Sequence, residues 1–203
     1  MKKILTLVLW MVCVERSSAQ DALSVLLAQH LNDSLMLERI DQFRKGGYAK
    51  SFDCGTRTRE EFIAKAKTYL GTPYQYGGTT TQGMDCSGLI FRTFRDLGLQ
   101  APHGAQALAR FGQIVLDRDE LMPGDVIFFS RTYPTSKLVT HAAFVIEDGQ
   151  MIHASTSKGV QIVPMDDPYY WNEHYLFGTR IFGVIPEVPI PKDADTPVRL
   201  NED

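Results

Sequence analysis

One cysteine and two histidines, distant in the sequence, have the residue types needed for nucleophilic catalysis. Cys86 lies in Asp85-Cys86-Ser87-Gly88, between a glycine-rich loop and an apolar segment. His141 opens one apolar stretch, and His153 closes the next one. A thiol, a base and a third polar group that orients the base form a thiol-nucleophile site. A buried structural cysteine and structural histidines are the alternative for each residue taken singly.

Cys86 is expected in the first turn of a helix. The residues after it recur at helical spacing until Gly98, and they are Leu89, Ile90, Phe91, Phe94 and Leu97. The helix dipole and the unpaired amides at a helix N-terminus stabilise a thiolate, so we expect a lowered pKa for Cys86. Asp85 and Ser87 also fit the role of helix N-terminal caps.

The two histidines fall on predicted neighbouring strands. Short β-branched or aromatic stretches bounded by turns indicate strands at 125–130, 142–147, 150–153, 160–164 and 180–185. Asp148-Gly149 and Lys158-Gly159 are typical hairpin turns. Across the first hairpin, His141 and His153 would lie near each other at one end of the sheet.

Helices are predicted mainly before the strands. Leucines at helical spacing around the caps Asp33 and Ser34 predict two short helices, or one broken helix, within 21–45. A capping box of Thr58 and Glu61 predicts the next helix, which ends near Gly71, and a short helical stretch is expected around 105–111. Helices followed by strands indicate an α+β domain with the helices packed on an antiparallel sheet.

The first 19 residues have the layout of a secretory signal peptide. Lys2 and Lys3 precede an apolar run, and small residues lead up to Ala19. The run is too short to cross a bilayer, which needs about 20 apolar residues. Bulky residues before Cys13 argue against lipidation there. We expect an exported protein with no membrane span after cleavage, and a disordered tail at 186–203.

Cleavage after Ala19 leaves 18 Lys and Arg against 23 Asp and Glu, a formal net charge of −5. An acidic protein is a poor partner for nucleic acid. The remaining cysteines, Cys54 and Cys86, could form a disulfide in an oxidising compartment, although the surroundings of Cys86 favour a reactive thiol. The Cys and His spacing matches no compact zinc signature and lacks a fourth ligand. We therefore expect no metal and no other cofactor.

Several motifs in order resemble the NlpC/P60 family of cell-wall cysteine peptidases, closest to its Spr-type murein endopeptidases. The motifs, which fall within residues 58–185, are Tyr74-Gln75-Tyr76-Gly77-Gly78, Asp85-Cys86-Ser87-Gly88, Pro123-Gly124-Asp125, Thr140-His141 and His153-Ala154-Ser155-Thr156. The family commonly has Pro-Arg-Ser after the nucleophile helix, whereas this chain has Pro102-His103-Gly104.

The resemblance implies a papain-like fold with about five antiparallel strands. Cys86 would be the nucleophile, His141 the base and His153 the residue that orients it, while Tyr74 would assist at the oxyanion. Asp85 and Ser87 would help to bind substrate. The implied organisation is a signal peptide at 1–19, a helical segment and linker at 20–57, a catalytic domain at 58–185 and the tail.

The resemblance also implies the substrate, the stem peptides of peptidoglycan. The bond is either the crosslink between D-alanine and diaminopimelate or the bond from D-glutamate to the diamino acid, and we expect a monomer. The rival hypotheses are a catalytically silent wall-binding module and a thiol-histidine acyltransferase of related fold. Residues that match the nucleophile and the base argue against the first, and the absence of a membrane-binding segment argues against the second.

Overall fold

The computed structural model describes residues 22–147 and 149–183. The predicted signal peptide, Asp148 of the predicted hairpin turn and the predicted tail lie outside these residues. The described helices are 22–29, α2 (Ser34–Lys45), α3 (Arg59–Lys67), α4 (Cys86–Asp96), α5 (Ala105–Leu108), the 3-10 helix η1 (Arg118–Glu120) and α6 (Trp171–His174). In the described residues, no helix has the length and apolar character needed to cross a membrane.

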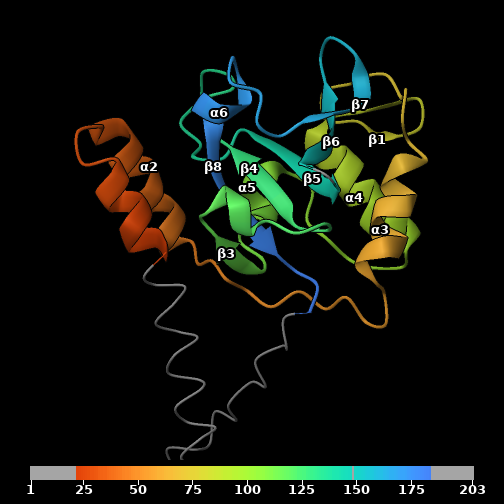
Figure 1. Cartoon of the computed structure of the whole chain (residues 1–203), viewed down its shortest axis with the longest axis horizontal. Coiled ribbons are helices and arrows are strands. Elements are labelled where there is room, and N and C mark those ends of the chain that lie inside the picture. The colour runs from red at the N-terminus through yellow and green to blue at the C-terminus, as the bar shows by residue number, and fades with distance from the viewer. Residues whose placement is uncertain (1–21, 148, 184–203) are drawn as a thin grey trace, which may run out of the picture.

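An antiparallel sheet of six strands forms the centre of the molecule (Figure 1), in the order β3-β8-β4-β5-β6-β7. Its strands are β3 (Gln113–Val115), β4 (Val126–Phe129), β5 (His141–Glu147), β6 (Gln150–Ser155), β7 (Gly159–Pro164) and β8 (Tyr175–Arg180). The predicted meander of four strands corresponds to β4 through β7. A short ribbon of β1 (Thr79–Thr80) and β2 (Gly83–Met84) stands apart from this sheet.

One predicted strand was misplaced, and one strand was missed. The expected strand at 180–185 lies earlier, as β8, and the short strand β3 was not expected, so the sheet has six strands rather than about five. β8 contains Gly178, whose lack of a side chain leaves room for Leu121 against the strand. A glycine inside a strand weakens the pattern by which a strand is recognised.

The two helices at the beginning of the described chain share the core of the main domain. Asp33 caps α2 by accepting a hydrogen bond from the amide of Met36, as its sequence position predicts. Phe43 at the end of α2 is fully buried, and its ring lies 5.9 Å from that of Phe177 in β8. Leu31 and Leu35 in the predicted apolar pattern are 70% and 54% exposed, however, because other residues supply the buried faces of the two helices.

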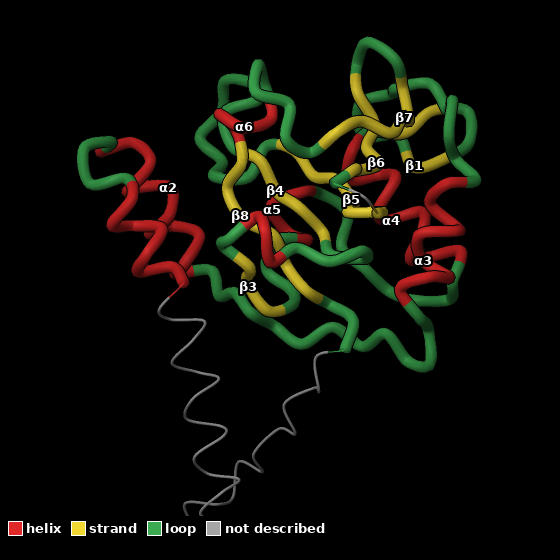
Figure 2. The backbone as a smooth tube through the Cα atoms, in the orientation of Figure 1, coloured by secondary structure: helices red, strands yellow, loops and turns green. Residues whose placement is uncertain are grey.

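The chain then crosses the molecule to reach α3, through residues 46–58 as a long loop (Figure 2). Thr58 and Glu61 form the predicted capping box at the start of α3. α3 and α4 pack together with one face of the sheet around a core that includes Phe62, Phe94 and Phe144. This packing holds the start of α4 against the sheet.

Candidate active site

Cys86 is the first residue of α4, as its sequence context predicts. Asp85 is the N-cap, and its Oδ1 accepts a 2.7 Å hydrogen bond from the amide of Gly88. The backbone amide of Ala142 in β5 is one of the groups that favour the Cys86 thiolate, together with the amides of Ser87 and Cys86 itself. The Cys86 thiol therefore lies beside the start of β5, the strand that begins with His141.

The glycine-rich loop is tied to the start of α4 through Asp85. Asp85 Oδ2 accepts a 2.8 Å hydrogen bond from the amide of Gly77, and its own amide donates to the carbonyl of Gly78 at 3.1 Å. A Cβ atom at Gly88 would collide with that same carbonyl, so only glycine permits this approach. The aspartate and the glycine of the Asp-Cys-Ser-Gly motif therefore hold the glycine-rich loop against the start of α4.

The predicted neighbours His141 and His153 are hydrogen-bonded. Their Nε2 and Nδ1 atoms, respectively, lie 3.0 Å apart. β5 and β6 pair with Phe144 opposite Ile152, and continuing this register makes the two histidines diagonal neighbours on one face. Since Nε2 of His141 faces His153, its Nδ1 is the nitrogen left to act on a thiol.

Two aromatic rings cover the histidine pair. Trp171 of α6 stacks on His141 with ring centroids 5.1 Å apart, and its ring is perpendicular to that of His153 at 4.9 Å. Phe129 of β4 contacts His141 from a neighbouring strand, with centroids 5.9 Å apart.

Burial lowers the pKa of His141 well below 6.5, with a further contribution from the charge of His153. Burial also lowers the pKa of His153 to about 4. Both rings are therefore neutral near pH 7.

The expected lowering of the Cys86 pKa is not found. Burial of the thiol, followed by the negative charge of Asp85, raises its pKa to about 12, although backbone amides oppose this shift. The helix N-terminus is thus outweighed by desolvation and by its own acidic cap. The surroundings of Cys86 thus favour the protonated thiol over the thiolate.

Tyr74 lies in the same region as the predicted nucleophile. It forms an isolated bridge with Met84, close to the start of α4. Burial, and then the charges of Cys86 and Asp85, raise its pKa to about 12, so the phenol keeps its proton. Tyr133 of the β4–β5 loop, which sequence reasoning missed, also feels the charges of Cys86 and Asp85, after burial as the main cause of its raised pKa.

Residues 71–180 match the model of the NlpC/P60 family. The chain belongs to this family. The predicted resemblance and the predicted enzyme class, a cysteine peptidase, are thereby confirmed.

Relatives of known name support the same assignment. The chain is 40% identical over 116 residues to the probable endopeptidase NlpC of Escherichia coli, and this match covers 57% of the chain and 73% of the relative. It is 35% identical over 139 residues to the gamma-DL-glutamyl hydrolase of Bacillus subtilis, covering 67% and 33%. It is 38% identical over 114 residues to the murein DD-endopeptidase MepS/murein LD-carboxypeptidase of E. coli, covering 56% and 57%. The chain thus spans from one third to three quarters of these proteins.

A solved structure confirms the α+β NlpC/P60 fold. An NlpC/P60 family protein from Bacillus cereus aligns with a TM-score of 0.56 at 32% identity, covering 63% of this chain and 41% of that one. The sheet of this chain has six antiparallel strands, whereas about five were expected.

His103 occupies the place where the family commonly has arginine, and it contacts the helix cap. Its Nε2 atom lies 3.5 Å from Asp85 Oδ1, and its ring lies 5.7 Å from that of Phe91. A cation near Asp85 is therefore retained only when His103 is protonated. Ser87, 5% exposed, donates a 2.9 Å hydrogen bond to the same carboxylate oxygen.

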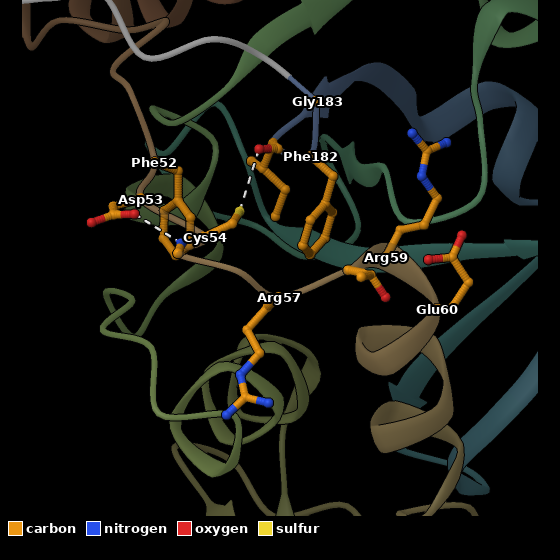
Figure 3. A pocket seen from close by; sticks show the side chains of 11 residues that line it. Phe52, Asp53, Cys54, Arg57, Arg59, Glu60, Phe182 and Gly183 are labelled. Atoms are coloured by element: carbon orange, nitrogen blue, oxygen red, sulfur yellow. Dashed lines mark hydrogen bonds between the residues drawn. The ribbon is translucent and has the colours of Figure 1, made fainter.

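Cys54 lines a separate cavity of about 280 Å³ together with Phe52, Arg59 and Phe182 (Figure 3). Its thiol donates to the carbonyl of Ile181 at 3.4 Å, and burial raises its pKa to about 11. Figure 3 shows the charged ends of Arg57 and Arg59 directed away from the thiol. No histidine lines this cavity, and both Cys54 and Cys86 are free rather than joined in the alternative disulfide.

Proposed function

We propose that the chain is an exported cysteine peptidase that hydrolyses amide bonds in peptidoglycan stem peptides, with Cys86 as nucleophile and His141 as base. The geometry that carries this proposal is that of His141, which is hydrogen-bonded to His153, stacked on Trp171, and adjacent in β5 to Ala142, whose backbone meets the Cys86 thiol. A neutral imidazole accepts a proton, which a neutral thiol must lose before it attacks an amide.

In the acylation step, the Cys86 sulfur attacks the carbonyl carbon of the scissile bond, and its proton passes to His141 Nδ1. The carbonyl oxygen becomes an oxyanion, which the Cys86 amide and the protonated phenol of Tyr74 would stabilise. The C–N bond then breaks as His141 returns the proton to the leaving amine. The product is a thioester on Cys86.

In the deacylation step, water attacks the thioester carbonyl and gives a proton to His141. The C–S bond breaks, the Cys86 sulfur regains that proton, and the new carboxyl group leaves. His153 takes no part in bond formation, because it only orients the base. The same reasoning predicts unequal effects of substitutions at the two histidines.

For the bond, we propose the crosslink between D-alanine and diaminopimelate. A carboxylate offers about four lone-pair positions. Oδ1 of Asp85 accepts from Gly88 and Ser87 and lies 3.5 Å from His103, Oδ2 accepts from Gly77, and the side chain is 11% exposed. The contacts within the protein therefore leave one position, on the largely buried Oδ2, for the predicted binding of substrate by Asp85. A substrate whose stem peptide stays attached at its amino end makes no demand on that position, and the name of the E. coli MepS relative includes murein DD-endopeptidase.

The second candidate is the bond from D-glutamate to the diamino acid. It is favoured by the 35% identity to a protein whose name describes glutamyl hydrolysis. Digestion of purified muropeptides with defined linkages, followed by mass spectrometry, decides between the two. Crosslinked dimers converted to monomers support the proposal, whereas stem peptides shortened after D-glutamate support the second candidate. A protein that binds these muropeptides without releasing any product would instead be the silent wall-binding module.

Export is the remaining part of the proposal, since the substrate lies outside the cytoplasmic membrane. The basic residues Lys2 and Lys3 and the apolar run that follows support a cleaved signal. N-terminal sequencing of the protein recovered from the cell envelope tests this point. A mature chain that begins at Gln20 is expected, and a retained, acylated Cys13 would contradict it.

A further inference from the structure

The hydrogen bond between the two histidines continues onto the next strand. His153 in β6 is paired directly with Gln161 in β7, and the side-chain amide of Gln161 lies 3.3 Å from His153 Nε2. The same amide group lies 2.9 Å from the hydroxyl of Ser155, which also accepts a 3.2 Å hydrogen bond from the amide of Lys158. Four side chains on three strands therefore form one continuous network that ends at His141.

The direction of the protons along this network decides whether His141 is a base. A neutral imidazole has one N–H donor and one acceptor nitrogen. If His141 Nδ1 is to accept a proton, the ring hydrogen must sit on Nε2 and be donated to His153 Nδ1. His153 then carries its own hydrogen on Nε2, so that nitrogen requires an acceptor.

Only one end of the Gln161 amide meets this requirement. The amide nitrogen, which lies nearest to His153 Nε2 in the structure, is a donor. If it donates to His153, every proton in the network reverses and His141 Nδ1 becomes protonated. Half a turn of the amide exchanges its nitrogen for its oxygen, and the oxygen accepts from both His153 and the hydroxyl of Ser155. Ser155 still accepts from Lys158 and now donates to Gln161, so the contacts of Gln161 with His153 and Ser155 are both kept.

We propose that Gln161 is a positioning residue whose side-chain oxygen accepts a hydrogen bond from His153 and thereby fixes the tautomer in which His141 is a base. This inference rests on the proposed role of His141 in catalysis. The rings that surround the two histidines, Trp171 and Phe129, offer no competing carboxylate or amide. Gln161 is therefore the polar group among these neighbours that can set the direction of the protons.

Replacing Gln161 by an acceptor or by a donor tests the proposal. Gln161→Glu offers only acceptor oxygens and should keep kcat within about fivefold of the wild-type value, whereas Gln161→Lys offers only donors and should lower kcat by about 100-fold or more, since a wrong tautomer has a large cost. KM should change little in either variant. Gln150→Glu and Gln150→Lys are matched controls, because Gln150 is exposed at the start of β6 in the same sheet.

A second measurement needs no variant and no turnover. The ¹⁵N chemical shifts of the His141 ring in the wild-type protein should show Nε2 protonated and Nδ1 unprotonated. A protonated Nδ1 in the resting protein, or equal kcat for Gln161→Glu and Gln161→Lys, would overturn the inference. Activity retained by folded Cys86→Ala would instead overturn the proposed function, so the two failures are distinguishable.

Discussion

The indole of Trp171 stacks on the ring of His141, with an interplanar angle of 28°. The same indole is perpendicular to the ring of His153. The indole thus shields the hydrogen bond between the two histidines from water. Burial of the imidazole, to which this indole contributes, is the main cause of the lowered pKa of His141. The position of Trp171 is therefore linked to the protonation of His141, the proposed base.

We expect Trp171→Ala to raise the pKa of His141 towards 6.5, because the imidazolium becomes hydrated. The acid limb of kcat/KM should then move to higher pH, so that activity at pH 5 to 6 falls more than activity at pH 8. A pH profile on a defined muropeptide measures this. Tyr169→Ala is the control, since Tyr169 lies two residues earlier and is 90% exposed. An unchanged acid limb in Trp171→Ala would contradict the shielding role.

Stability should fall on acidification because His153 is buried in its neutral form. Its pKa is about 4 in the folded state against 6.5 as the ordinary value, so the unfolded state binds more protons between these pH values. The free energy of unfolding should decrease by about 3 kcal/mol from pH 7 to pH 4 on account of this residue. Urea denaturation at several pH values measures the loss. His153→Gln should reduce the pH dependence, and an identical dependence in both proteins would contradict this account.

Asp85→Asn should lower the pKa of Cys86, because the charge of Asp85 is the second cause of its elevation. The rate of alkylation by iodoacetamide at pH 8 to 9 should rise accordingly. The amide group should also leave Gly77 without its acceptor, at a cost of about 1–3 kcal/mol in stability. Asp33→Asn is the matched control, since Asp33 caps α2 instead. Slower alkylation of Cys86 in Asp85→Asn would refute the electrostatic argument.

The local features of this site were predictable from the sequence. The capping box of Thr58 and Glu61, the helix that begins at Cys86 and the neighbouring positions of His141 and His153 all follow from short-range patterns. Strand β8 was misplaced, because Gly178 interrupts its apolar pattern and a glycine more often indicates a turn.

The environment of the site was less predictable, because it depends on residues from distant segments. The pKa of Cys86 depends on burial under other segments, which the position at a helix N-terminus does not reveal. Trp171 reaches His141 from α6, and no spacing in the sequence indicates that stacking. The position of Gln161 beside His153 was predictable, because the predicted hairpin turn Lys158-Gly159 places Gln161 opposite His153 on the next strand.

The two histidines should differ in the cost of their removal. His141→Ala should abolish measurable cleavage, because neither the thiol nor the leaving amine then has a proton partner. His153→Ala should leave measurable activity, and His153→Asn or His153→Gln should recover part of the loss, since an amide oxygen can accept from His141 Nε2. Steady-state rates on crosslinked muropeptides, with thermal melting to verify folding, compare these variants. A His153→Ala protein as inactive as His141→Ala would assign His153 a role beyond orientation.

The central claim is that Cys86 forms the bond to the substrate carbonyl, and Cys86→Ala tests it most directly. The measurement is the rate at which stem-peptide products are released from purified peptidoglycan by the folded variant, with Cys54→Ala as the matched control at the other free thiol. Cys86→Ala should release no product above background, while Cys54→Ala should retain the wild-type rate. Release by Cys86→Ala at the wild-type rate would contradict the assignment of Cys86 as the nucleophile.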